Sequence, residues 1–405
     1  MLDRLAGNAE FSGAVVIRDA KGVRFARGYG MADPFSGRAF TSDTPADSAS
    51  LAKPFTAAAV LALAQDGKVD LDAAVRRYLP EYPHPPTTVR QLLSHSGGLV
   101  ANETAEGVAN KSNAALLAEA AAPSFPPGSA FSYCNLCSVA LAMLIERVSG
   151  ISYLDFLKRR IRAPRTLTLR PARLADWQGR AIGHRRTPEG KLEPFDIWEG
   201  ESFYGPANLS VSALELADWG SRWWRDLAPL RRAATEPAMV LGKSTGLTLG
   251  NWYCAPMGRR CHYLGHHEGF HHMLYWDAER RISVAMLSNN ALAPGLQQRL
   301  QRALVAAANG NPKAAAGELE ARLVGSAVRT GHFVLASGER IQIAGEGERR
   351  IVRRRGVAYA AFPVGESIRY VPGLDVYLAG TDQGRLRWLS LYEDVEGRPF
   401  DVISP

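Results

Sequence analysis

The sequence contains only four cysteines in 405 residues, which excludes a small scaffold held together mainly by disulfides. It has no uninterrupted apolar run of the ~18 residues that a membrane-spanning helix requires. Its N-terminal stretch, MLDRLAGNAEFSG, has neither the apolar core nor the cleavage site of a secretory leader. We therefore expect a cytoplasmic protein that does not enter a membrane, or a periplasmic one if a leader has been removed. Reduced cysteines fit a cytoplasmic location.

An extreme composition is also absent. With 46% hydrophobic and 22% charged residues, the chain is close to the globular average, which excludes a disordered or fibrous protein. The formal net charge of +8 favours anionic surfaces, but the basic residues are spread along the chain apart from one cluster, Arg349, Arg350, Arg353, Arg354 and Arg355. We interpret this cluster as a solvated strand face, with a docking surface for acidic partners as the alternative. No nucleic-acid partner is expected.

Hydrophobic patterning predicts an α+β domain in the larger, N-terminal part of the chain. Alternating residues at 11–33, around a turn at 19–22, predict a β-hairpin. Helical spacing then occurs at 54–65, 89–95, 112–121, 136–148, 153–162 and 294–307. Strand-like runs at 250–253, 262–265, 270–276 and 282–287 predict an antiparallel meander. Because strands lie at both ends with helices between them, we expect the two ends to share one sheet.

The pattern changes after residue 308. Residues 308–317 have the composition of a linker. Beyond them, short alternating runs separated by turns occur at 331–336, 340–344, 349–353, 357–362, 368–371 and 386–391. They predict a small all-β barrel or sandwich. We therefore divide the chain into a first domain at 1–310, a linker at 311–319 and a β-barrel domain at 320–405.

A serine precedes a lysine by three positions at the start of the first apolar helix, in SASLAKPFTAAAVLALAQ. Positions i and i+3 share one face of a helix, so the Lys53 ammonium would lie beside the Ser50 hydroxyl. A serine hydroxyl becomes a good nucleophile only when a neighbouring base accepts its proton. The first helical turn also offers backbone N–H groups to a developing oxyanion. The alternative is that Ser50 caps the helix and Lys53 is a solvated charge.

A second set of polar residues, Phe131-Ser132-Tyr133-Cys134-Asn135, follows a Pro-Pro-Gly turn and precedes another apolar helix. A phenol held near an ammonium has its pKa lowered and can relay protons, so Tyr133 is a candidate partner of Lys53. The Asn135 amide could orient a substrate carbonyl. The alternative is that Tyr133 packs in the core and Asn135 caps the helix.

Histidines are concentrated in one strand-like segment, between His262 and His272. A basic side chain on a strand edge beside the nucleophile would bind an anionic group, and the edge could lend a backbone N–H to an oxyanion. The H-x-G sequence His267-Glu268-Gly269 suits this purpose. A zinc site is the alternative, but His266 and His267 would point to opposite faces of a strand and could not easily hold one ion.

The cysteines form two close pairs. Cys134 and Cys137 make a CxxC at the start of a helix, which we interpret as core packing rather than a redox site. Cys254 and Cys261 flank a tight turn, where a disulfide is conceivable but a reducing cytosol would oppose it.

Taken in order, these motifs resemble the penicillin-recognising serine hydrolases, which include class C β-lactamases, DD-carboxypeptidases, D-aminopeptidases and related esterases. The resemblance covers residues 11–290 and rests on FSGAVVIRDAKGVRFARGYGMAD, SLAKPFTAAAVLALAQDGKVDLDAAVRRYLP, VRQLLSHSGGL, FPPGSAFSYCNLCSVALAMLIERVSG and WDAERRISVAMLSNN. It implies a class C β-lactamase-like domain, in which helices flank an antiparallel sheet beside a helical subdomain. The C-terminal barrel resembles those appended to D-aminopeptidases.

The resemblance also implies a role for each motif residue. Ser50 would be the acylated nucleophile, Lys53 its base, Tyr133 the partner in proton transfer and Asn135 the substrate-orienting amide. The third family motif, K-T-G or H-x-G, falls at His266 to Gly269. Relatives usually place several more residues between this motif and the Gly-Phe pair that Gly269-Phe270 matches. We choose His267 for this motif by pattern and keep His266 in reserve by position.

The resulting prediction is a serine hydrolase that forms an acyl-enzyme on amide or peptide bonds and needs no metal or organic cofactor. A histidine in the third motif favours a D-amino-acid peptidase or amidase over a true β-lactamase, with a small-ester hydrolase or weak β-lactamase as the alternative. Glu268 or Glu103 could bind the substrate ammonium. A non-catalytic scaffold that kept the fold is the second alternative. The expected partner is a small molecule or short peptide, and homo-oligomerisation is left open.

Overall fold

The computed structural model describes residues 2–7, 11–99, 111–120, 123–171, 173–186, 191–196, 203–292, 294–320, 327–335, 338–345, 350–354, 356–363, 368–371, 376–381, 383–389 and 394–400. They belong to two compact units. One comprises residues 13–181 and 197–287, and the other comprises residues 1–12, 182–196 and 288–405. Glu103, Arg349 and Arg355 lie outside the described residues. The division at 1–310, 311–319 and 320–405 stays a prediction.

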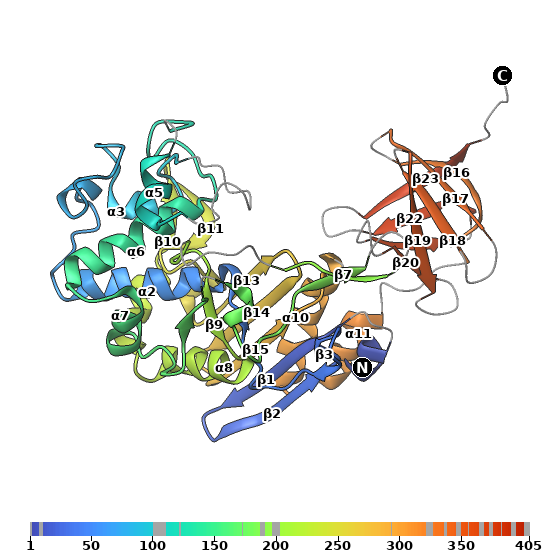
Figure 1. Cartoon of the computed structure of the whole chain (residues 1–405), viewed down its shortest axis with the longest axis horizontal. Helices are drawn as coiled ribbons and strands as arrows, with labels where there is room; N and C mark the ends of the chain where they lie inside the picture. Colours follow the sequence, from blue (N-terminus) through green and yellow to red (C-terminus); the bar gives the residue numbers. More distant parts are fainter. Residues whose placement is uncertain are drawn as a thin grey trace. The chain divides into compact units, whose positions relative to one another are not determined.

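The first unit is built on a six-stranded sheet in the order β12-β13-β14-β15-β1-β2. The strands are β1 (Gly13–Asp19), β2 (Gly22–Tyr29), β12 (Tyr253–Cys254), β13 (Arg260–His267), β14 (Phe270–Asp277) and β15 (Ile282–Ser288). The N-terminal hairpin lies beside β15, so segments from the two ends of the domain share the sheet as predicted (Figure 1). Only the last residue of the strand expected at 250–253 belongs to β12, because Asn251 turns the chain with φ +59°.

Helices lie between these groups of strands, which confirms the α+β class. They are α2 (Ala52–Gln65), α3 (Val89–Leu93), α5 (Asn113–Ala118), α6 (Asn135–Ser149), α7 (Tyr153–Arg160), α8 (Ala213–Ser221) and α9 (Ala228–Ala234). All residues of α2 from 52 to 63 are buried. A helix that is apolar all round belongs inside a domain, and α2 contacts α6, α7 and α9.

A cluster of aromatic rings holds α2 against the sheet. The ring of Phe55 on α2 stacks on Trp219 of α8, with centroids 3.6 Å apart. Trp219 in turn meets Trp223 at 5.7 Å, and Trp223 stacks on Trp276 of β14 at 5.5 Å. All four side chains are buried. Large rings in such geometry contribute both buried area and specific contacts, so this cluster fixes the start of α2 relative to β13 and β14.

The second unit contains an eight-stranded closed barrel, as predicted for the C-terminal part of the chain. Its strands are β16 (Gly331–Val334), β17 (Arg340–Ala344), β18 (Arg350–Arg354), β19 (Val357–Pro363), β20 (Ile368–Val371), β21 (Val376–Gly380), β22 (Leu386–Leu389) and β23 (Asp394–Phe400). β16 pairs with both β17 and β23, which closes the ring. The sequence analysis missed β21 and β23. β23 contains Gly397 and Pro399, residues that are rare inside strands.

Two helices precede the barrel, α10 (Pro294–Ala308) and α11 (Pro312–Glu320). The first was predicted, whereas the second occupies the stretch with linker composition. Within the arginine cluster, Arg354 makes a two-pronged ion pair with Glu339, with N–O distances of 3.1 and 2.6 Å. Its guanidinium lies 5.3 Å from the centre of the Trp388 ring. At least this member of the cluster is packed rather than solvated.

Both cysteine pairs form disulfides, Cys134–Cys137 and Cys254–Cys261. This corrects the expectation of thiols. The first pair lies at the start of α6, where one helical turn separates the two residues, and the second joins the paired positions of β12 and β13. The cellular compartment stays a prediction. No single helix among the described residues is both long and apolar enough to cross a membrane.

Candidate active site

The turn that carries Ser50 is short and tightly held. Residues Ala49–Leu51 form one 3₁₀ turn directly before α2. Ala49 has φ +47°, a left-handed conformation that is rare for residues other than glycine. Its N–H donates to Asp47 Oδ1 at 2.7 Å, and His272 Nε2 donates to the Asp47 carbonyl at 2.7 Å. Backbone strain of this kind persists only where neighbouring contacts enforce it, and here it presents Ser50 half-buried at the head of α2.

Lys53 lies beside the serine, as the i, i+3 spacing predicts. Its Nζ donates to Ser50 Oγ at 3.1 Å and to the Pro206 carbonyl at 3.3 Å. The side chain is only 1% exposed. A buried ammonium is costly unless it is hydrogen-bonded, so these contacts explain how the chain tolerates it. The first residues of α2 receive no side-chain cap, and the interpretation of Ser50 as a helix cap is therefore wrong.

The carbonyl that accepts from Lys53 belongs to a loop anchored to α2. The Thr56 hydroxyl donates to the Gly205 carbonyl at 2.7 Å and lies 2.7 Å from the Tyr153 hydroxyl. Gly205 has φ +110°, and a Cβ there would lie 2.4 Å from the Ser138 carbonyl oxygen. Only glycine lets the loop pass this close to α6. Thr56, one turn after Lys53, thereby holds the loop whose Pro206 carbonyl accepts the hydrogen bond from Lys53.

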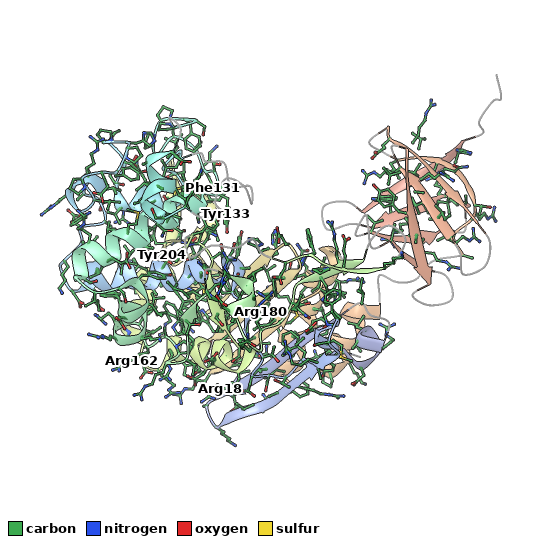
Figure 2. The ribbon with its side chains drawn as sticks, viewed as in Figure 1. Arg18, Phe131, Tyr133, Arg162, Arg180 and Tyr204 are labelled. Atoms are coloured by element: carbon green, nitrogen blue, oxygen red, sulfur yellow. A yellow bond between two sulfur atoms is a disulfide. The ribbon has the colours of Figure 1, made fainter. Side chains whose placement is uncertain are left out.

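Tyr133 completes the group around the serine. Its hydroxyl donates to Ser50 Oγ at 2.9 Å, and the Lys53 ammonium lies 4.7 Å from the centre of its ring. The side chain is 46% exposed, so a substrate can reach it. Figure 2 shows Tyr133 close to Phe131 on the loop that enters α6. Asn135 is the first residue of α6, two positions after Tyr133. The structure therefore brings Ser50, Lys53 and Tyr133 together as expected.

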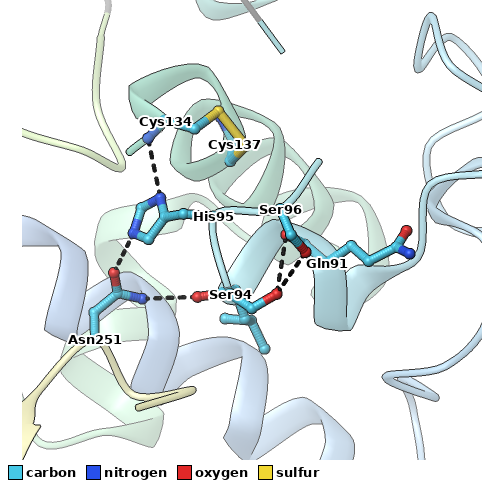
Figure 3. The surroundings of a disulfide bond; sticks show 8 residues. Gln91, Ser94, His95, Ser96, Cys134, Cys137 and Asn251 are labelled. Atoms are coloured by element: carbon cyan, nitrogen blue, oxygen red, sulfur yellow. Dashed lines mark hydrogen bonds between the residues drawn. A yellow bond between two sulfur atoms is a disulfide. The ribbon is translucent and has the colours of Figure 1, made fainter. Parts of the chain in front are cut away.

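A buried histidine that the sequence analysis did not select, His95, stacks on the ring of Tyr133. Figure 3 shows its hydrogen bonds to Cys134 and Asn251. His95 Nδ1 accepts from the Cys134 N–H at 3.1 Å. Its Nε2 therefore carries the hydrogen and donates to Asn251 Oδ1 at 2.6 Å. Burial, with a contribution from the nearby Lys53 charge, lowers the pKa of His95 to about 4. The imidazole is thus neutral at ordinary pH. The only sequence signal for it was its place in VRQLLSHSGGL, directly after a short helix.

The strand β13 borders the nucleophile turn and approaches it closely at Gly265. A Cβ on Gly265 would lie 3.0 Å from the Leu51 backbone nitrogen and 3.3 Å from the Ser48 carbonyl oxygen. Two residues earlier on the same face, the Tyr263 hydroxyl lies 3.4 Å from the Tyr133 hydroxyl. Tyr263, which the sequence analysis missed, therefore faces the Ser50 group from the strand.

This arrangement differs from the expected third motif. His267 pairs with Phe270, so Glu268 and Gly269 form a two-residue hairpin turn rather than a stretch of strand beside the serine. Strand alternation turns His266 to the opposite face from Tyr263 and Gly265. If the third motif instead ends at Gly265, several residues separate it from the pair Gly269-Phe270. Relatives have this spacing, whereas the expected motif His267-Glu268-Gly269 does not. The close approach of Gly265 to the nucleophile turn was not visible in the sequence.

The histidines of this hairpin are neutral groups. Burial, the first cause in each case, lowers the pKa of His267 and His271 to about 3 and that of His272 to about 4. The positive charges of Arg170 and Lys53 add to the effect at His267. Arg170 itself is buried and lies 3.9 Å from Asp47. Within the part of the chain that the structure describes, no group of three or more His, Cys, Asp or Glu side chains could hold a metal ion.

The geometry has one clear chemical meaning. A half-buried hydroxyl accepts hydrogen bonds from an amine and a phenol. The amine, when unprotonated, can take up the serine proton, and the phenol can relay protons. The turn at the head of α2 and the edge of β13 beside Gly265 both present backbone groups to a carbonyl bound at Ser50. Such an arrangement suits attack on an acyl group.

Known proteins are similar to this chain in sequence. The chain is 30% identical over 173 residues to penicillin-binding protein 4* of Bacillus subtilis, covering 40% of this chain and 38% of that protein. It is 28% identical over 299 residues to a D-aminopeptidase of Cereibacter sphaeroides, covering 68% of this chain and 56% of that protein. The chain thus spans less than two thirds of the length of these relatives.

A solved structure extends the likeness in fold to almost the whole chain. The octameric penicillin-binding protein homologue from Pyrococcus abyssi superposes with a TM-score of 0.66 at 20% sequence identity, covering 98% of this chain and 97% of that one. The Beta-lactamase family matches residues 3–309, the segment in which Ser50, Lys53 and Tyr133 meet. The chain therefore belongs to the beta-lactamase family, whose members are serine hydrolases.

Proposed function

We propose that this protein is a serine hydrolase that forms an acyl-enzyme at Ser50 and cleaves amide or peptide bonds of D-amino-acid substrates. The observation that carries the hydrolase proposal is the meeting of two groups, an amine and a phenol, on the oxygen of Ser50. Ser50 Oγ lies 3.1 Å from Lys53 Nζ and 2.9 Å from Tyr133 Oη. The similarity to a D-aminopeptidase supports the substrate class.

The reaction begins when Lys53, in its unprotonated amine form and with Tyr133 as proton relay, takes the proton from the Ser50 hydroxyl. The oxygen then forms a bond to the substrate carbonyl carbon, and backbone N–H groups of the nucleophile turn and of β13 near Gly265 stabilise the oxyanion. As the C–N bond breaks, the proton passes through Tyr133 to the leaving amine. Water then attacks the ester carbonyl and gives its proton to the same relay. The bond between the carbonyl carbon and Ser50 Oγ breaks, the relay returns the proton to Ser50, and the acid leaves.

A fluorophosphonate probe tests the acyl-enzyme. We expect covalent labelling of wild-type Ser50, detected by intact mass and peptide mapping, and none in Ser50→Ala. Tyr133→Phe should label about a hundredfold more slowly, because it loses a relay worth about 10²–10⁴ in rate. Lys53→Met removes the amine from a buried site, so its melting temperature is measured in parallel. Absence of labelling in a folded wild-type protein would favour a non-catalytic scaffold.

Substrate comparison tests the finer proposal. D-alanine p-nitroanilide, its L-enantiomer, p-nitrophenyl butyrate and nitrocefin are compared by kcat/KM on the same preparation. The proposal predicts the highest value among amides for the D-anilide. Equal rates for the two enantiomers contradict the D-peptidase assignment and leave the hydrolase standing. Preference for the butyrate ester over every amide supports the small-ester alternative, and preference for nitrocefin supports a weak β-lactamase.

Self-association is a separate proposal. The Pyrococcus abyssi homologue is octameric, and we propose that this chain also forms a homo-oligomer. Sedimentation velocity over a range of concentrations tests it. A single species of about 44 kDa, the mass of one chain, overturns it.

A further inference from the structure

The side chain that β13 turns toward the nucleophile is a buried phenol. Tyr263 is 2% exposed, and its hydroxyl lies 3.4 Å from the hydroxyl of Tyr133. Burial raises the pKa of Tyr263 well above its ordinary value. This wall of the site therefore carries an uncharged group that can donate one hydrogen bond.

The histidines of β13 do not supply the positive charge that Tyr263 lacks. Burial lowers the pKa of His262 to about 4 and also lowers that of His266. Arg170 and Lys53 are the basic side chains whose charges act most strongly on His267. Both are buried, Arg170 beside Asp47 and Lys53 on Ser50 and Pro206. Arg260 begins β13 and lies on the opposite face of the strand from Tyr263. His267 shares the face of Tyr263, but burial lowers its pKa to about 3. Among the described residues of β13, the face that carries Tyr263 therefore presents no cation to a substrate bound at Ser50.

The accessible part of the site is aromatic. Phe131, Tyr133 and Tyr253 are 42%, 46% and 43% exposed. The Tyr253 ring stacks on that of Tyr263, with centroids 6.1 Å apart, and on that of His262 at 5.6 Å. Exposed rings grouped at one place are typical of a binding surface for aromatic or apolar groups. Here Phe131 lies two residues before Tyr133, and Tyr253 stacks on Tyr263, so exposed rings adjoin both phenols beside the nucleophile.

We propose that the site selects acyl donors that carry no carboxylate next to the scissile bond and have an aromatic or apolar group there instead, with Tyr263 as the residue that sets this preference. A carboxylate next to the scissile bond would lose its hydrating water. It would then contact the neutral phenol of Tyr263 and aromatic ring faces, which do not compensate its negative charge. An aromatic group would continue the stack on Tyr253. This inference rests on the proposed hydrolase function.

Two esters that differ only in one carboxylate test the inference. The phenyl ester of phenylacetylglycine and its 3-carboxyphenyl counterpart release leaving groups of similar shape. Wild-type protein should favour the phenyl ester by about tenfold or more in kcat/KM. In Tyr263→Lys the preference should shift by about tenfold toward the carboxyphenyl ester. Tyr263→Phe removes the hydroxyl without adding charge, so its ratio of the two rates should stay close to that of wild type.

A second variant covers the case in which a buried lysine prevents folding. Tyr253→Ala removes the exposed ring and should lower kcat/KM for the phenyl ester by about fivefold or more, whereas Phe35→Ala, a control with 50% exposure on the loop between β3 (Met31–Asp33) and β4 (Arg38–Ala39), should not. Faster wild-type cleavage of the carboxyphenyl ester overturns the inference. So does an unchanged ratio in a folded Tyr263→Lys. If neither ester is cleaved and the fluorophosphonate does not label Ser50, the hydrolase proposal itself fails, and the inference fails with it.

Discussion

The imidazole of His95 stacks on the phenol ring of Tyr133, with ring centroids 5.0 Å apart and planes inclined by 23°. The same imidazole accepts the N–H of Cys134, the next residue. His95 has φ +55° and follows Ser94, the residue that caps the end of α3. The neutral imidazole of His95 thus holds both the ring of Tyr133 and the peptide bond that follows it, and the Tyr133 hydroxyl reaches Ser50.

Replacing His95 should therefore slow acylation without removing any group that touches the substrate. We expect His95→Gln to lower the rate of fluorophosphonate labelling by about tenfold to a hundredfold, because small misplacements of a catalytic group are costly. His84→Gln, which removes a ring that lies edge-on to Tyr82, is the matched control and should label at the wild-type rate. A wild-type rate in folded His95→Gln would mean that Tyr133 holds its place unaided.

Gly265→Ala should disable the site by crowding the nucleophile turn. The new Cβ would lie 3.0 Å from the Leu51 backbone nitrogen, and backbone atoms cannot move aside as a flexible side chain can. We expect a loss of about a hundredfold in kcat/KM. Gly7→Ala, where a Cβ meets nothing within 4 Å, serves as the control. Retained activity in Gly265→Ala would show that β13 can withdraw from the turn without affecting Ser50.

Cys134, which lies between the two residues of the second motif, Tyr133 and Asn135, forms a disulfide with Cys137 in the first turn of α6. Reduction of this disulfide frees the first turn of α6, so we expect dithiothreitol to slow labelling of Ser50 by about threefold or more. The double variant Cys134→Ser with Cys137→Ser should be slow from the start and insensitive to dithiothreitol. A reductant effect of equal size in this variant would assign the effect to Cys254–Cys261 instead.

The stability of the fold should fall in mild acid. In the folded state burial lowers the pKa of His95, His262 and His272 to about 4, from an ordinary value of 6.5. Between these pH values the unfolded chain binds more protons than the folded one, so the free energy of unfolding falls as the pH falls from about 6.5 to about 4. Each group contributes up to about 1.4 kcal/mol per pH unit.

Thermal unfolding measured at several pH values tests this expectation. The melting temperature should be level above about pH 7 and should drop by several degrees between about pH 6.5 and 5. His262→Gln removes one of these imidazoles and should make the drop smaller. A melting temperature that is constant or rises on acidification to pH ~5 would contradict the buried neutral imidazoles.

Local patterns were sufficient for most of the elements. The hairpin at 11–33, the helix after Ser50 and the meander up to β15 follow from periodicities of two and 3.6 residues, which depend on near neighbours alone. The pairing of Ser50 with Lys53 also follows from local geometry, because both lie within one turn. The helix at the predicted linker and the strands β21 and β23 were missed. Their periodic patterns are short, and the amino-acid composition of these segments is more typical of linkers and turns.

By itself, therefore, the sequence determined the class of fold, the family and the contact between a serine and a lysine one turn apart. Only the tertiary structure decided which side chains from distant segments join them. Tyr263, His95 and the Pro206 carbonyl reach the site from a strand, a helix end and a loop, and no local pattern encodes which face of β13 meets α2. That choice depends on the packing of Phe55 and the tryptophans around it, and on the close approach of Gly265 to Leu51.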